Sequence, residues 1–206
     1  MLEKPWLRAN APSKNDSRLM NDSLPLFPTL ILTLKLDQTT FEQVNTLRQQ
    51  YFPPARNIVP AHITLFHALP GDHKGTIAQH LQTQCAQIPA IDLHLPTLRF
   101  LGNGVAIEVE APALVELRQS FAQTWSDWLT AQDQQKYRPH ITLQNKVAAA
   151  TARQTYEELT QQWQPTRGNA EGVLLWYYRN GPWELAHEFS FRSAPTNTNS
   201  LKLGYR

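Results

Sequence analysis

The sequence lacks the features that mark several large classes of protein. One cysteine, Cys85, occurs in 206 residues, which excludes an internal disulfide and a cysteine-cluster metal site. No apolar run reaches the roughly 18 residues that a transmembrane helix needs, and the N-terminal stretch has no apolar core of a signal peptide. The net charge of +2 is too small to indicate that the protein wraps nucleic acid. We therefore expect a cytoplasmic monomer with no membrane contact and no obligatory protein partner.

Length and composition indicate one folded domain with polar ends. The chain has 41% hydrophobic residues in 23.6 kDa, which is enough for a proper core. Residues 1–24 and 193–206 are polar and show no periodicity. We expect a flexible N-terminal arm and a flexible C-terminal tail there, with a single domain over residues 25–192.

The tetrapeptide His-Ile-Thr-Leu occurs twice, at residues 62–65 and 140–143. A shuffled chain of this composition would contain far less than one copy, so chance is a poor explanation. Side chains two residues apart in a strand share a face. We therefore expect His62 and Thr64 to point into a cleft from one strand, and His140 and Thr142 from another.

These residue types suit chemistry at a phosphodiester. An imidazole is a base when neutral and an acid when protonated, and a threonine hydroxyl can donate a hydrogen bond to an anionic oxygen. A single histidine on a half-buried strand is more often structural than catalytic, but the duplication reverses that balance. The remaining histidines have no counterpart across the repeat and are predicted to be structural or surface residues; they are His67, His73, His80, His94 and His187.

The two motifs lie in two similar halves of the chain. The shift between the histidines is 140 − 62 = 78 residues, and the same shift superimposes the helices and strands that the periodicity predicts. This pattern indicates an α+β fold made of two lobes, with two antiparallel sheets lining a central cleft and helices outside. The predicted helices are 39–50, 74–88, 112–130 and 148–163. Besides the two motif strands, the predicted strands are 27–36, 91–101, 104–110, 171–179 and 183–192.

The contexts NIVPAHITLFHALP and RPHITLQNKV resemble the 2H phosphoesterase superfamily, which includes bacterial 2′-5′ RNA ligases and RNA 2′,3′-cyclic phosphodiesterases. The resemblance covers about residues 25–192 and implies a bilobal fold and phosphoester chemistry without a metal or another cofactor. It implies that His62 and His140 are the acid–base pair and that the two motif threonines bind phosphate. Arg138 resembles an arginine often found two residues before the second histidine.

Further candidates for substrate binding are less specific. The first motif has Pro60 where the second has Arg138, so a matching positive charge must come from elsewhere, and Arg56 is the candidate. Phe66 lies two residues beyond Thr64, on the cleft face by strict alternation, where it could stack on a base. Tyr51, Trp176 and Tyr178 are candidates for the nucleotide end of the cleft; for each aromatic residue, packing in the core is the alternative.

The prediction is a metal-independent phosphodiesterase that opens the 2′,3′-cyclic phosphate of an RNA end or a nucleotide to a 2′-phosphate. Two alternatives keep the same site: 2′-5′ RNA ligation, and a non-catalytic module that binds RNA ends or nucleotides. A metal site is disfavoured, because the two histidines are far apart in the sequence and no third ligand or H-x-x-x-H pattern accompanies them.

Overall fold

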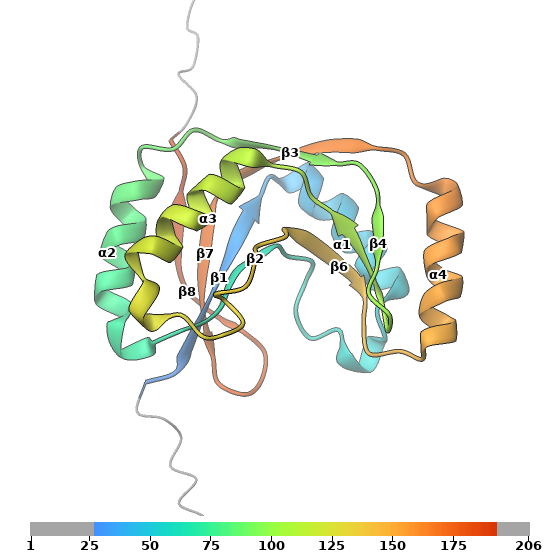
Figure 1. Cartoon of the computed structure of the whole chain (residues 1–206), viewed down its shortest axis with the longest axis horizontal. Coiled ribbons are helices and arrows are strands. Elements are labelled where there is room, and N and C mark those ends of the chain that lie inside the picture. Colours follow the sequence, from blue (N-terminus) through green and yellow to red (C-terminus); the bar gives the residue numbers. More distant parts are fainter. Residues whose placement is uncertain (1–26, 193–206) are drawn as a thin grey trace, which may run out of the picture.

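The structure, a computed structural model, describes residues 27–192; the arm and the tail predicted to be flexible lie outside this range. Two antiparallel sheets face each other and helices lie outside them (Figure 1). The larger sheet contains β1 (Thr29–Leu36), β2 (Thr64–Leu69), β3 (Ile91–Leu95), β7 (Thr166–Tyr178) and β8 (Glu184–Ser190), and the smaller contains β4 (Leu98–Phe100), β5 (Val105–Glu108) and β6 (His140–Gln144). The predicted α+β class with two antiparallel sheets is confirmed.

The helices match the predicted periodic segments to within a few residues, except that the predicted helix 112–130 is shorter. They are α1 (Gln38–Tyr51), α2 (Lys74–Cys85), α3 (Pro112–Thr124) and α4 (Ala149–Gln162), with short 3₁₀ turns at Pro54–Arg56, Gly71–His73 and Ser126–Trp128. Asp37 caps α1, because its carboxylate accepts the backbone N–H of Thr40 at 3.0 Å. In the described range, no helix is long and apolar enough to cross a membrane.

The two halves of the repeat exchange their last strands. In each half a central strand pairs with the motif strand, β1 with β2 and β5 with β6. The strand on the other side of each central strand comes from the opposite half. β7 of the second half pairs with β1 of the first half, and β4 of the first half pairs with β5 of the second half. This exchange joins the two sheets into one domain and sets the motif strands in a fixed relation.

The predicted strand 91–101 is wrong in one respect, because it is two strands in different sheets. β3 pairs with β7 in the larger sheet, whereas β4 pairs with β5 in the smaller. Pro96 lies between them. Proline has no N–H to donate to a ladder and is poorly tolerated inside a central strand, so the chain leaves one sheet there and enters the other.

Helices of one half also pack on strands of the other. Arg48 of α1 donates to the carbonyl oxygen of Thr142 in β6, and Arg118 of α3 donates to the carbonyl oxygen of Leu65 in β2. Figure 1 shows α2 and α3 on one flank of the molecule and α4 on the other. Each motif strand is therefore held from behind by a helix that belongs to the opposite half.

The pairing of β2 with β1 has a bulge directly after the threonine of the first motif. Thr64 pairs with Thr33 and Phe66 pairs with Leu32, so Leu65 is an extra residue on β2. A bulge changes which residues share a face of the strand. The predicted cleft position of Phe66 is therefore wrong: its side chain is fully buried.

The second motif carries the same irregularity. In β6, Thr142 pairs with Ala106 and Gln144 pairs with Val105, so Leu143 is the extra residue. Gln144 is buried and donates to the hydroxyl of Thr155 at 3.0 Å. Both motif strands thus turn away from regular alternation immediately after the threonine, which is a device often found beside functional sites.

The buried position of Phe66 can be tested by its effect on stability. Its ring contacts Trp125 at 5.3 Å between centroids and lies under the guanidinium of Arg118. Phe66→Ala should lower the free energy of unfolding by about 3–5 kcal/mol, because it leaves a cavity. Tyr178→Ala, at a side chain that is 40% exposed, is the control and should cost about 1 kcal/mol or less. Equal losses in urea unfolding would place Phe66 outside the core.

Candidate active site

The two motif histidines make the same local hydrogen bond. Nδ1 of His62 lies 2.7 Å from the carbonyl oxygen of Pro60, and Nδ1 of His140 lies 2.9 Å from the carbonyl oxygen of Arg138. A carbonyl oxygen only accepts, so Nδ1 carries the hydrogen in both rings. This bond fixes the tautomer and leaves Nε2 with a lone pair. Each ring therefore presents one nitrogen that is able to take a proton and later return it.

Both histidines favour the neutral form. Burial lowers the pKa of His62 to about 4, against the opposing effect of the hydrogen bond to Pro60, and the positive charges of Arg48, His140 and His67 lower it further. Burial likewise lowers the pKa of His140. Since the charge of His140 acts on His62 and the charge of His67 acts on both, the three rings lie within electrostatic reach of one another.

An apolar pocket of about 280 Å³ lies on the side of His62. Trp183 packs against the imidazole with ring centroids 4.7 Å apart, and Trp176 lies 6.1 Å from Trp183. The Trp176 indole donates to the hydroxyl of Thr33 at 2.8 Å, which fixes the ring. Phe41, another aromatic residue, also lines this pocket. Flat apolar walls of this kind suit a nucleobase.

A basic pocket of about 320 Å³ lies on the side of His140. Thr64 and His140 line it together, so the structure brings the first and second motifs to one cavity. Its other lining residues include four cationic side chains, Arg99, Arg118, Lys136 and Arg138. The first motif thus contributes His62 to the apolar pocket and Thr64 to the basic pocket. Such a pair of cavities suits a nucleoside on one side and phosphate on the other.

Two buried arginines position the motif strands. Arg48 donates to the Thr142 carbonyl oxygen at 2.6 Å, to the Asn57 side chain at 2.9 Å and to the Val59 carbonyl oxygen at 3.2 Å. These contacts tie the loop before the first motif to the strand of the second. Arg118 binds the carbonyl oxygens of Leu65 and Asp133, so it holds the strand of the first motif against the loop that leads to the second.

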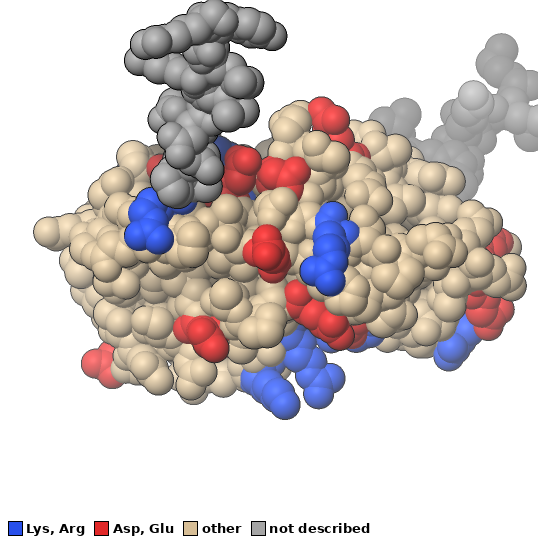
Figure 2. Space-filling view, turned by 90° about the horizontal axis from the view of Figure 1, so that it is seen from above, with Lys and Arg blue, Asp and Glu red and all other residues tan. Residues whose placement is uncertain are grey.

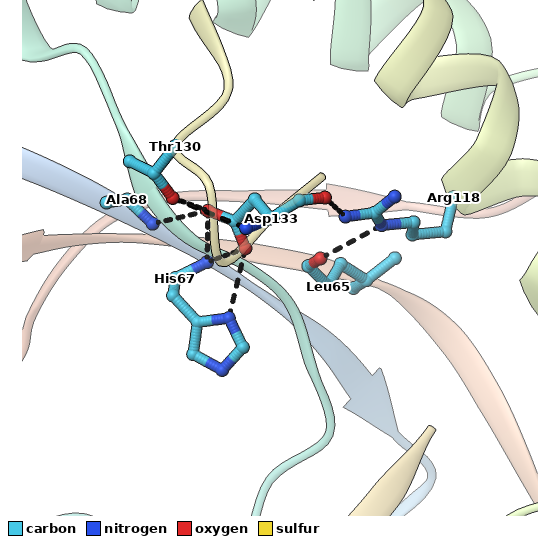
Figure 3. A network of polar contacts seen from close by, with 6 residues as sticks. All are labelled: Leu65, His67, Ala68, Arg118, Thr130 and Asp133. Carbon is cyan, nitrogen blue, oxygen red and sulfur yellow. Dashed lines mark hydrogen bonds and ion pairs between the residues drawn. The ribbon is translucent and has the colours of Figure 1, made fainter. Parts of the chain in front are cut away.

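A third histidine lies in the basic pocket, bound to a buried carboxylate (Figure 3). Asp133 accepts the backbone N–H groups of His67 and Ala68 and lies 3.0 Å from Nδ1 of the His67 ring. Burial raises the pKa of the Asp133 carboxyl, but the hydrogen bonds from His67 and Ala68 outweigh it, so the net pKa lies below the usual value. The carboxylate is therefore charged and fully engaged.

The predicted site residues fall into three groups. Arg138 lines the basic pocket and Trp176 the apolar pocket. Thr142 is half-buried and lines neither pocket, although its carbonyl oxygen is bound by Arg48. The third group, which consists of Arg56, Phe66, Tyr51 and Tyr178, also lies outside both pockets. Within it, Arg56 donates to the carbonyl oxygen of Lys146, and Phe66 is buried in the core.

Sequence reasoning missed several residues of these pockets, namely His67, Asp133, Lys136, Arg118 and Trp183, and it also missed Arg48, which binds the strand of the second motif. His67 was predicted to be a structural or surface residue, because it has no counterpart across the repeat. Strict alternation would also put it on the face opposite Thr64, but the bulge brings it to the pocket. Asp133 stands in a polar loop with no local signal. Only the position of His67, five residues after His62 in the same segment, could have drawn attention to it.

Charge is mixed on the face of the molecule seen in Figure 2, unlike the charge in the basic pocket. On the face seen in Figure 2, Lys and Arg side chains alternate with Asp and Glu among uncharged residues, with no continuous field of one sign. Among residues 27–192, no group of three or more His, Cys, Asp and Glu residues is arranged to hold a metal ion. Four cationic side chains, by contrast, line the basic pocket together.

Comparison with known proteins agrees with this architecture. The sequence profile of the 2′-5′ RNA ligase superfamily matches residues 36–182, more than half of the chain. In the search of curated protein sequences, none matches this chain. The fold is similar to the crystal structure of TT0787 from Thermus thermophilus, with a TM-score of 0.58 and 15% identity over 80% of this chain and 98% of that one. It is also similar to E. coli LigT complexed with 3′-AMP, with a TM-score of 0.55 and 17% identity over 80% and 98%.

The lowered pKa of His62 predicts how stability depends on pH. An unfolded histidine takes up its proton near pH 6.5, whereas folded His62 does so near pH 4. Between these values the unfolded state binds more protons, so the free energy of unfolding should fall as the pH is lowered from 6.5 towards 4. Urea unfolding should show this fall to be smaller in His62→Asn, which keeps a donor for Pro60 but does not titrate. Parallel curves for the two proteins would contradict the assigned burial.

Proposed function

Because this chain belongs to the 2′-5′ RNA ligase superfamily, we propose that it is a phosphodiesterase that opens a 2′,3′-cyclic phosphate on an RNA end or a nucleotide, leaving a 2′-phosphate. The observation that carries this proposal is the matched pair of motif histidines. Each has Nδ1 bound to the carbonyl oxygen two residues before it, and each therefore has Nε2 available for proton transfer. Two such groups, one for the attacking oxygen and one for the leaving oxygen, are what in-line displacement at phosphorus needs.

In the proposed step, Nε2 of one neutral histidine takes a proton from water as the water oxygen attacks phosphorus. The bond between phosphorus and the ribose 3′-oxygen breaks, and the 3′-oxygen takes a proton from Nε2 of the other, protonated histidine. The product carries a phosphate on the 2′-oxygen and a free 3′-hydroxyl. The two histidines exchange roles when the reaction runs backwards, as in 2′-5′ ligation, where a ribose hydroxyl replaces water.

The surroundings stabilise the charge of this reaction. The transition state is anionic and spreads its charge over the equatorial oxygens. Thr64 and Arg138 line the same pocket as His140, and we assign Thr142 to the same oxygens from the second motif. Partial burial, which lowers the pKa of both histidines, also reduces the bulk solvent around them, and this strengthens hydrogen bonds to the phosphoryl group. No metal ion enters this scheme.

The direct test is turnover of an oligonucleotide that ends in a 2′,3′-cyclic phosphate, in the presence of a chelator. Wild type should release the 2′-phosphate, and His62→Asn and His140→Asn should each lower kcat by about 10²–10⁴-fold, because each removes a proton-transfer group. The control is His187→Ala, which changes an exposed side chain on β8 and should retain full activity. Product analysis by chromatography distinguishes a 2′-phosphate from a ligated chain. Binding without turnover in wild type would contradict the proposal.

The pH profile should be bell-shaped and acidic for the free enzyme. One histidine must be neutral and the other protonated, and the pKa values of both lie below 6.5. The maximum of kcat/KM should therefore lie between about pH 4 and pH 6.5. The maximum of kcat should lie at higher pH, because a bound phosphate anion favours the imidazolium. A value of kcat/KM that keeps rising above pH 7 would exclude a protonated histidine as the acid.

A further inference from the structure

We propose that the basic pocket binds a second phosphate of the substrate, through His67 held by Asp133 and through Lys136. The proposal rests on the proposed function, in which the scissile phosphate lies between His62 and His140. It names a class of substrate: a nucleotide or an RNA end that carries another phosphate beside the cyclic one, rather than a nucleoside cyclic phosphate alone.

The orientation of His67 is the first observation. Its Nδ1 faces the Asp133 carboxylate, so Nε2 is the nitrogen left to meet a ligand (Figure 3). The side chain is 47% exposed, whereas Asp133 is 1% exposed. The ring therefore stands at the wall of the pocket with its inner edge anchored. In the protonated ring both nitrogens donate, so Nδ1–H can bind the Asp133 carboxylate while Nε2–H donates to an anion in the pocket.

A purely structural role does not account for the ring. The Asp133 carboxylate already accepts two backbone N–H groups, from His67 and Ala68, and a contact from the Thr130 hydroxyl. Arg118 holds the backbone carbonyl of Asp133 as well. These contacts attach the loop around Asp133 to β2 without any side chain at position 67. The imidazole adds one more bond to the carboxylate and directs its other face to the cavity.

The charge of the pocket is the second observation. Asp133 is the one carboxylate among its described lining residues, and that carboxylate is fully occupied. Arg99 is paired with Glu108 at 3.2 Å, and Arg118 is bound to carbonyl oxygens. Lys136 and Arg138 are exposed and make no ion pair with any residue in the range 27–192. Arg138 adjoins the second motif, so Lys136 remains as positive charge beyond what the scissile phosphate uses.

The size of the pocket and an unpartnered hydroxyl are the third observation. A volume of about 320 Å³ corresponds to about ten water molecules, which is more than one phosphoryl group fills. Tyr137 lines the same pocket, and its hydroxyl is buried with no hydrogen-bond partner in the described structure. A buried hydroxyl without a partner is costly, and this one belongs to a residue of the pocket wall.

The test compares two substrates that differ in one phosphate. They are adenosine 2′,3′-cyclic phosphate with a 5′-hydroxyl and the same compound with a 5′-phosphate. Wild type should prefer the second by at least about tenfold in kcat/KM, the contribution expected of one hydrogen bond between charged groups. A ratio near one in an active wild type would overturn the inference while leaving the proposed function intact.

Variants at position 67 separate binding from structure. His67→Asn keeps an amide donor near the place of Nδ1, so it can still bind Asp133, but it has no group in the place of Nε2. We expect His67→Asn and His67→Ala both to reduce the preference for the 5′-phosphate towards one, and Lys136→Ala to reduce it as well. His187→Ala should leave the ratio unchanged. Full preference in His67→Asn together with loss in His67→Ala would show a structural role and overturn the assignment.

Equilibrium binding keeps the two proposals distinguishable. Adenosine 2′-monophosphate and adenosine 2′,5′-bisphosphate can be titrated into wild type and His67→Asn by calorimetry, with no turnover required. We expect wild type to bind the bisphosphate about tenfold more tightly and His67→Asn to bind both alike. If wild type binds the bisphosphate more tightly but hydrolyses no cyclic phosphate, the second-phosphate site is supported and the proposed reaction is rejected. Equal affinities in wild type would reject the site.

Discussion

Two buried guanidinium groups, those of Arg48 and Arg118, determine how the two halves of the molecule meet. Each belongs to a helix of one half and binds a backbone carbonyl oxygen in the motif strand of the other. Burial lowers the pKa of Arg48 to about 10, so the side chain remains charged at neutral pH. A buried charge of this kind is costly unless its donors are satisfied. Its bonds therefore permit few other arrangements of the helix, the loop and the strand.

The chemistry of the site depends on that arrangement. With the strands held from behind, the bulge after each motif threonine sets the direction of the side chains, and the bond from each Nδ1 to a carbonyl oxygen sets the ring. Arg48 also acts on His62 directly, because its charge lowers the pKa of that histidine. A group that positions the second motif thus contributes to keeping the first histidine neutral. The strand exchange between the halves extends the same coupling to the whole domain.

What could be predicted from the sequence is what depends on local pattern. The repeated tetrapeptide, the amphipathic helices and the 78-residue shift are visible in the order of residues, and they led to the two-sheet fold. Phe66 and His67 show where such reasoning ends. Regular alternation places Phe66 in the cleft and His67 behind it, and one inserted residue in the pairing of β2 reverses both positions. A bulge depends on the partner strand, so it cannot be read from the strand alone.

Contacts between distant segments could not be predicted either, because they also depend on a partner elsewhere in the chain. Asp133 lies 66 residues from the histidine that it binds, and no feature of its loop marks it as a partner. The error in the predicted strand 91–101 is the one that the sequence could have prevented, because proline is poorly tolerated in the middle of a strand and Pro96 lies there. The residues that sequence reasoning found include the four that we propose to act on phosphate, whereas the residues that it missed include Arg48 and Arg118, which hold the motif strands.

In the proposed reaction, two imidazoles from distant parts of the chain act on one phosphorus atom. A crystal structure of the protein with a nucleoside 2′-phosphate bound tests it most directly. We predict that Nε2 of His62 and Nε2 of His140 both lie within about 3.2 Å of oxygen atoms on the same phosphate. A phosphate that contacts the residues of one motif only, with the other imidazole turned away from it, would contradict the account.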